Sequence, residues 1–160
     1  CYEAWVSRWL DCDYINLGFA GAAKGEDAIV DFMTSIDISA FVCDYDHNAS
    51  TAKHLQDTLP KLYEKMRKAH PDIPYIFISK PDIYFDYEEN NKTRSVVMDC
   101  YNKAMRSGDK NVWFIDGYSL FGGEGREECT VDRVHPNDLG FYRMAEIICK
   151  TLQTAFYTKN

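Results

Sequence analysis

The amino-acid sequence predicts an α/β domain in which a parallel β-sheet is covered by helices on both faces. Short apolar runs of the kind found in buried strands alternate along the chain with longer stretches whose apolar residues recur at helical spacing. Strands separated by helices at this interval form βαβ units, and such units build parallel sheets. The 160 residues, 46% of them hydrophobic and 27% charged, suit one domain with its own core. We therefore expect a single three-layer α/β/α domain over residues 1–160.

The helices are expected from apolar spacing and from residues that cap or break a helix. A stretch over residues 51–70 places Leu55, Leu59 and Leu62 on one stripe. Pro60 in its middle is expected to kink or split it. Asn137 is the expected N-cap of the last helix. We expect helices at residues 2–10, 26–35, 51–70, 93–107 and 137–156.

The strands are expected to be short, and the connections after them to carry the chemistry. We expect strands at residues 14–17, 40–43, 73–79 and 112–115 and irregular connections at 80–91 and 121–131. In parallel α/β sheets, functional residues lie in the loops at the carboxyl ends of the strands. Three such loops carry unusual residues, namely 18–25, 44–50 and the stretch that ends at His135.

Charge and composition exclude several classes of function. The net charge is −7, and no basic stripe is visible, so a nucleic-acid partner is not expected. No apolar run approaches the roughly 20 residues of a membrane span, so no membrane partner is expected. The six cysteines form no CxxC pair, which argues against a zinc site and, in a domain of this size, does not favour a disulfide framework. Without a signal peptide, we expect a cytoplasmic protein, with secretion left open because the start of the chain looks incomplete.

An aspartate and a histidine lie three residues apart just before the last expected helix. At this spacing, the carboxylate of Asp132 can meet the imidazole of His135. The carboxylate would fix the ring tautomer and stabilise the imidazolium that forms when the second nitrogen takes a proton. Taken alone, the pair is also compatible with two ordinary surface residues.

Two loops contain groups that can stabilise negative charge. The glycines that follow the strand at 14–17, in the letters NLGFAG, allow a sharp turn that presents backbone N–H groups. Asn48 can aim its side-chain amide at a developing oxyanion. Alone, each is compatible with an ordinary turn. Asp44, Asp46 and His47 could be read as metal ligands, but successive residues rarely converge on one ion, so no metal is expected.

Together, these blocks resemble the SGNH (GDSL-type) serine hydrolases, over nearly the whole chain. In that family, a glycine block, an asparagine block and a D-x-x-H block follow in this order. Gly21 matches the first, Asn48 the second, and Asp132 with His135 the third, although the usual G-x-N-D is replaced here by D-Y-D-H-N. The continuation HPNDLGF and residues 111–122 resemble an acylhydrolase and carbohydrate-esterase branch.

The family's first block, a strand that ends in G-D-S or G-S-S and carries the nucleophilic serine, is absent from these residues. The sheet of the family resembles the flavodoxin-like order 2-1-3-4-5, in which that strand is central. Its loss would leave a gap of roughly 10 Å and a row of unpaired backbone groups. We therefore expect that residues 1–160 belong to a longer polypeptide, incomplete at the N-terminus, or that another chain or a second copy completes the sheet.

The resemblance implies a carboxylic ester hydrolase that works through an acyl-enzyme without a metal or organic cofactor. Its substrate would be a small-molecule or carbohydrate ester with a short acyl group, such as O-acetyl. The aromatic stretch Tyr84-Phe85-Asp86-Tyr87 could stack on a sugar or simply pack. Two alternatives stay open. One is a non-catalytic binding domain with this fold, and the other is a metal-dependent phosphoesterase that uses Asp44, Asp46 and His135.

Overall fold

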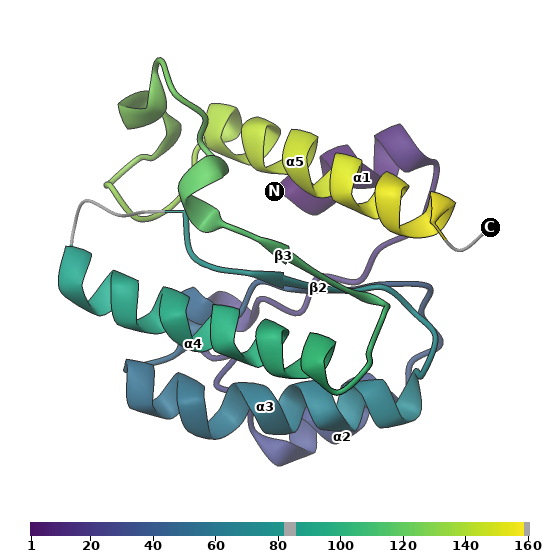
Figure 1. Ribbon diagram of the computed structural model, residues 1–160. Helices are drawn as coiled ribbons and strands as arrows, with labels where there is room; N and C mark the ends of the chain where they lie inside the picture. The colour runs from purple at the N-terminus through teal and green to yellow at the C-terminus, as the bar shows by residue number, and fades with distance from the viewer. Residues whose placement is uncertain (82–85, 159–160) are drawn as a thin grey trace.

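Three parallel strands form a sheet between two layers of helices in the computed structural model, which describes residues 1–81 and 86–158 (Figure 1). The strands β1 (Phe41–Cys43), β2 (Tyr75–Ile78) and β3 (Val112–Ile115) lie side by side in the order β1-β2-β3. Val42 pairs with Ile76, which pairs with Trp113. One face of the sheet is covered by α1 (Tyr2–Leu10) and α5 (Asp138–Tyr157), and the other by α2 (Asp27–Thr34), α3 (Ala52–Ala69) and α4 (Tyr87–Arg106). The expected α/β class is confirmed.

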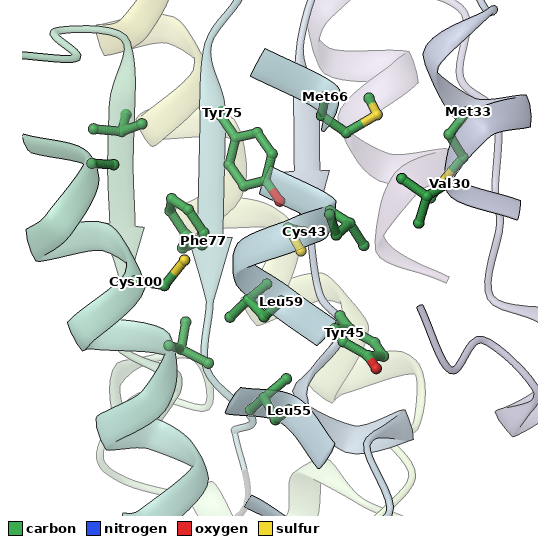
Figure 2. Packing of buried hydrophobic residues seen from close by; sticks show 14 residues of the cluster. Val30, Met33, Cys43, Tyr45, Leu55, Leu59, Met66, Tyr75, Phe77 and Cys100 are labelled. Carbon is green, nitrogen blue, oxygen red and sulfur yellow. The ribbon is translucent and has the colours of Figure 1, made fainter. Parts of the chain in front are cut away.

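Strand β2 divides the apolar interior into two cores. Tyr75 and Phe77 pack into the core beneath α2, α3 and α4, where Figure 2 shows them beside Leu59 and Cys43. Ile76, which alternates with them, packs into the core beneath α1 and α5. Successive side chains of a strand point to opposite faces, and all four β2 residues are buried, as expected for the middle strand of a covered sheet.

Most expected elements agree with the structure to within two residues at either end. Helix α1 and strand β3 have the expected bounds, α2 lies within 26–35, and β1 and β2 lie within their expected runs. At the start of α5, the side-chain oxygen of Asn137 accepts the N–H of Gly140 at 3.0 Å, so the expected N-cap is confirmed.

Of the two outcomes expected for Pro60, a kink or a split, the split is wrong, because α3 continues over all 18 of its residues. A proline inside a helix costs about 3 kcal/mol, since it removes one backbone hydrogen bond and crowds the preceding turn. The apolar stripe around it offsets that cost, since Leu55, Leu59 and Leu62 are buried along the same face as Met66. Burial of the stripe outweighs the local penalty.

Helix α4 begins six residues earlier than the sequence predicts. Asp86 is its N-cap and accepts the N–H of Glu89, and Glu88 and Glu89 place negative charge in the first turn. The polar run Asn90-Asn91 favours a loop by propensity, but the cap and the acidic first turn extend the helix through it. Tyr84 and Phe85 of the aromatic stretch lie outside the described residues.

Residues 14–17, expected as a strand, form none in the structure. A strand needs a hydrogen-bonded partner, and the sheet order places no described strand beside this segment. Short helical turns interrupt the connections at Phe19–Gly21, Asp46–Asn48, Gly117–Ser119 and Arg126–Cys129. Among the described residues, we find no helix long and apolar enough to cross a membrane.

Candidate active site

Asp132 and His135 form a hydrogen-bonded pair in the loop that precedes α5. The His135 Nδ1 lies 2.6 Å from Asp132 Oδ2. The other carboxylate oxygen accepts two backbone N–H groups, that of Val134 at 3.0 Å and that of His135 at 2.7 Å. Arg133 between them adopts a left-handed conformation with φ 72°, which turns the chain back on itself. One carboxylate therefore fixes both the turn and the imidazole, as the spacing of the two residues predicts.

These contacts also decide the protonation of the pair. The N–H of His135, its ring and the N–H of Val134 together lower the pKa of Asp132 to about 2. Asp132 is therefore ionised near neutral pH, and a neutral imidazole beside it carries its proton on Nδ1. The side chain of His135 is 76% exposed, so its Nε2 edge is open to an approaching group. The ring can accept a proton on Nε2 while Asp132 stabilises the resulting charge.

The two ends of the loop that holds the pair are tied to each other. Thr130 forms a bridge with Pro136, and the N–H of Val131 donates to the carbonyl of His135 at 2.9 Å. At the helix start, the N–H of Asn137 donates to the carbonyl of Cys129. Figure 1 places this connection, between β3 and α5, at the end of the sheet where β3 terminates. The pair thus lies at the carboxyl ends of the strands, where the sequence predicts the chemistry.

The glycine-rich loop has an unusual backbone. Phe19, Ala20 and Gly21 all have positive φ, at 48°, 47° and 83°, and the carboxamide oxygen of Asn16 accepts the N–H of Gly18 at 2.9 Å. A Cβ on Gly21 would meet no atom within 4 Å, so its backbone angle, rather than space, calls for glycine. Residues other than glycine rarely adopt this conformation, and such strain often lies at functional sites.

Asn48 lies in the short helical turn that follows β1, and a buried carboxylate anchors that turn. Asp46 is 1% exposed, its Oδ2 accepts the N–H of Lys80 at 3.0 Å, and the Lys80 ammonium lies 3.8 Å from Oδ1. Burial raises the pKa of Asp46, although the Lys80 N–H and ammonium oppose the rise. The loops after β1 and β2 are thereby joined just beside Asn48.

The structure brings two of the predicted blocks into contact and places the third nearby. Asn48 Nδ2 lies 3.5 Å from the carbonyl of Gly18, so the asparagine meets the loop that carries Gly21. Desolvation of the His47 ring lowers its pKa to about 4, and electrostatic interactions with Lys80 and His135 contribute to the decrease. His135 is therefore within electrostatic range of the residue before Asn48. In the described parts of the chain, no hydrogen bond or ion pair joins His135 to Asn48 or Gly21 directly.

Two of the side chains considered as metal ligands are engaged by other residues. Asp46 is bonded to Lys80, and the Nδ1 of His135 to Asp132. Burial, with the nearby charges of Asp46 and Glu3, raises the pKa of Asp44 to about 7, although the hydroxyl of Tyr2 bonds to its carboxyl. Within the described ranges, no group of three or more histidine, cysteine, aspartate or glutamate side chains is arranged to hold a metal ion.

A groove of about 1000 Å³ lies beside β1. Its lining includes β1 itself and residues 14–17. Side chains from both helical layers also line it, among them Val6 of α1 and Met33 of α2. It therefore lies in the layer of the sheet, between the two helical layers. Gly18 and Asn48 both border the groove, so it reaches the candidate site.

Lys24 and Lys80 are the residues of this site that the sequence analysis missed. The Lys24 ammonium donates to the carbonyl of Asn48 at 2.8 Å, and the Lys80 N–H donates to Asp46. Both contacts join segments at least 24 residues apart, and no local pattern marks them. One feature of the sequence could have pointed to Lys24: it is a lysine in a glycine-rich loop whose other residues are apolar and mostly small.

The chain is similar to known proteins in sequence and in fold. Residues 1–153 match the model of the GDSL-like lipase/acylhydrolase family. No curated protein matches the sequence. A protein described as a GDSL-like lipase from Bacteroides ovatus ATCC 8483 shares 28% identity and a TM-score of 0.86, over 98% of this chain and 47% of that one.

Two further solved structures share the fold at lower identity. The salicylyl-acyltransferase SsfX3 from a tetracycline biosynthetic pathway is 18% identical with a TM-score of 0.79, over 97% of this chain and 48% of that one. An active-site mutant of a family two carbohydrate esterase from Clostridium thermocellum is 17% identical with a TM-score of 0.68, over 96% of this chain and 53% of that one. The chain thus spans about half the length of these structures.

Proposed function

The chain belongs to the GDSL-like lipase/acylhydrolase family, and from this premise we propose that the protein hydrolyses carboxylic esters with Asp132 and His135 as its proton-transfer pair. The observation that carries the proposal is the 2.6 Å contact between His135 Nδ1 and Asp132 Oδ2, with the Nε2 edge of the ring exposed. This arrangement suits a histidine that removes a proton from a nucleophile and returns it to a leaving group.

In the proposed reaction, a serine hydroxyl attacks the ester carbonyl while His135 Nε2 takes the hydroxyl proton. The tetrahedral intermediate collapses, the C–O bond to the alcohol breaks, and the imidazolium donates its proton to the departing alkoxide. Water, deprotonated by His135, then attacks the acyl-serine ester. The C–O bond to the serine breaks, the imidazolium returns its proton to the serine oxygen, and the carboxylic acid is released. Asp132 stays ionised throughout and stabilises each imidazolium, consistent with its low pKa.

Gly21 and Asn48 are the proposed donors to the oxyanion of both tetrahedral intermediates. The Asn48 amide has only a long, weak contact of 3.5 Å to the Gly18 carbonyl, so little would have to be broken before it turned to another oxygen. The left-handed backbone at Gly21 suits an N–H held in an unusual direction. Each such donor typically lowers the barrier by about 3–4 kcal/mol.

We place the nucleophilic serine upstream of Cys1, at the carboxyl end of one more strand. The groove beside β1 supports this placement because it lies in the layer of the sheet and is covered by apolar side chains of both helical layers. Neighbouring strands lie about 4.8 Å apart, so one strand parallel to β1 would pair with its free edge. Such a strand would end near Gly18 and Asn48, which border the same groove.

The connection to α1 supports the same placement. Tyr2, the first residue of α1, interacts electrostatically with Asp44, the residue that directly follows β1. Helix α1 therefore starts near the carboxyl ends of the strands. In a βα unit, this is where the strand ends and the connection to its helix begins. A serine at the end of that strand would reach the loops of Gly21 and Asn48.

We extend the proposal to short acyl esters, in particular O-acetyl groups on carbohydrate. The fold is shared with a protein described as a carbohydrate esterase. The exposure of His135 suits a substrate whose alcohol portion is large and stays outside the site. Tyr87, at the start of α4, is 63% exposed and available to a sugar ring.

The test treats the full-length protein with a fluorophosphonate that labels activated serines, and maps the label by mass spectrometry. Hydrolysis of p-nitrophenyl acetate and of acetylated xylan is measured in parallel. The proposal expects ester cleavage and a single labelled serine upstream of Cys1. A protein that cleaves no ester and takes no label would instead be a non-catalytic domain, and loss of activity to a chelator alone would favour a metal-dependent enzyme.

A further inference from the structure

Lys24 joins the two loops that carry the proposed oxyanion donors. Its ammonium donates to the main-chain carbonyl of Asn48 at 2.8 Å in a half-buried setting. Lys24 itself follows Gly21 by three residues, in the same glycine-rich loop. A charge-assisted bond of this length is stronger than one between neutral groups. One side chain therefore fixes the distance between the Gly21 loop and the Asn48 loop.

The backbone of Lys24 is held as firmly as its side chain. Its carbonyl accepts the hydroxyl of Tyr45 at 2.6 Å and lies 2.8 Å from Nε2 of His54. The Tyr45 hydroxyl also lies 2.8 Å from the Thr58 hydroxyl, and the Lys24 N–H donates to Glu26. Tyr45 follows β1, while His54 and Thr58 belong to α3. The lysine is thus anchored on α3 and on the segment that directly follows β1.

The next residue shows how closely this anchor is packed. A Cβ on Gly25 would lie 3.0 Å from the Tyr45 hydroxyl oxygen and 3.2 Å from Thr58 Cβ. Gly25 also has φ +72°, which favours glycine. The end of the glycine-rich loop therefore packs directly against Tyr45 and α3. The positions of Tyr45 and α3 determine where this end of the loop lies.

Asn48, by contrast, has little that holds its side chain. The 3.5 Å contact of its amide with Gly18 is at the limit of a hydrogen bond. Its main chain is held by its own N–H, which donates to the Tyr45 carbonyl at 3.0 Å, and by Lys24, which binds its carbonyl. Loss of the lysine contact would leave the peptide after Asn48 without its cationic donor, and the 3.3 Å bond from the Ala49 N–H to the Asp46 carbonyl would be its remaining main-chain contact.

We infer that Lys24 is a positioning residue that sets the geometry of the oxyanion donors Gly21 and Asn48. This inference rests on the proposed ester hydrolysis, since the donors matter only where an oxyanion forms. Donors that stabilise a transition state must be placed before the reaction, and a displacement of about 1 Å can cost on the order of 100-fold in rate. Lys24 acts through Asn48 and touches no reacting atom.

The test compares three variants of the full-length protein, Lys24→Met, Lys24→Arg and the control Lys110→Met. Methionine keeps the length and apolar stem of Lys24 but removes the donor, whereas arginine keeps a cationic donor. Lys110 is exposed in the turn before β3, at the amino ends of the strands and so at the end of the sheet opposite the candidate site. For each variant, kcat and KM are measured with p-nitrophenyl acetate, and active enzyme is counted by fluorophosphonate titration.

We expect Lys24→Met to lower kcat by about 10- to 100-fold while KM changes by less than about threefold. Lys24→Arg should recover part of kcat, and Lys110→Met should match the wild type. A merely structural lysine would instead reduce the titrated fraction of active enzyme and leave kcat per active site unchanged. That result, or an unchanged kcat in Lys24→Met, would overturn the inference.

Hydrogen–deuterium exchange separates this inference from the proposed function. In folded Lys24→Met, the amides of Asn48 and Ala49 should exchange faster, and those of β2 should not change. If the wild type cleaves no ester, the proposed function fails, and the exchange result still decides whether Lys24 holds the Asn48 loop. If exchange at Asn48 is unaffected, the positioning role is excluded even in an active enzyme.

Discussion

The buried carboxylate of Asp46 accepts the backbone N–H of Lys80 at 3.0 Å, and so connects the loop after β1 with the loop after β2. The two residues are 34 positions apart in sequence. Both loops lie at the carboxyl edge of the sheet, where Asn48 and His47 follow Asp46 directly. The candidate site is thus built on a contact within the body of the domain rather than on its loops alone.

Replacement of Asp46 by alanine should destabilise the protein by about 1–3 kcal/mol, because the half-buried N–H of Lys80 loses its acceptor. Urea unfolding measures the change. Asp99→Ala is the control, since Asp99 is exposed on α4 and its removal should cost far less. Equal stabilities of the two variants would show that the Asp46–Lys80 contact contributes little.

The pair Asp132–His135 predicts a pH dependence of stability. The pKa of Asp132 lies near 2 in the folded protein, below the ordinary value of 3.8. The ionised carboxylate therefore stabilises the fold above about pH 4, and this contribution disappears as the pH falls through about 2. Asp132→Asn should be less stable than the wild type at pH 5, and the difference should vanish near pH 2. A difference that persists unchanged at pH 2 would contradict the assignment.

Gly21→Ala separates backbone strain from function. Its φ of +83° should cost an alanine about 1–2 kcal/mol, and no atom lies within 4 Å of the new methyl group. Gly108→Ala is a matched control, because Gly108 has φ +95°, also has nothing within 4 Å, and precedes β3 at the opposite edge of the sheet. Both variants should lose similar stability in urea unfolding, but only Gly21→Ala should lose kcat. Equal kcat values would remove Gly21 from the oxyanion site.

Gly140 is a second position where the site depends on a close approach. A Cβ there would lie 2.1 Å from the carbonyl oxygen of Cys129, which also accepts the N–H of Asn137. Gly140→Ala should push α5 away from this segment, with a loss of about 1–3 kcal/mol in the free energy of unfolding. Gly123→Ala, with nothing within 4 Å, is the control. A Gly140→Ala protein as stable as the control would show that the segment yields without cost.

Local patterns were sufficient to predict much of the fold. The apolar spacing of α1 and the apolar run of β3 gave their bounds, and Asn137 marked the start of α5. The predictions of secondary structure were wrong where contacts between distant segments, rather than local sequence, determine the conformation. Burial of the apolar stripe keeps α3 continuous through Pro60, and residues 14–17 form no strand because no described strand lies beside them.

In the candidate site too, the sequence predicted the local contacts but not those between distant segments. The contact between Asp132 and His135 spans three residues, so their spacing alone predicted it. The contacts of Lys24 with Asn48 and of Asp46 with Lys80 join segments 24 and 34 residues apart. Such contacts depend on how β1, α3 and β2 pack, and no single motif encodes them.

The most direct measurement is kcat/KM of full-length His135→Ala for p-nitrophenyl acetate, beside the control His70→Ala. His70 ends α3 and precedes β2, at the edge of the sheet away from the site. If His135 moves the proton, His135→Ala should lose at least about 1000-fold in kcat/KM while its thermal unfolding stays close to that of the wild type, and His70→Ala should remain active. A folded His135→Ala protein with near wild-type turnover would remove His135 from the reaction.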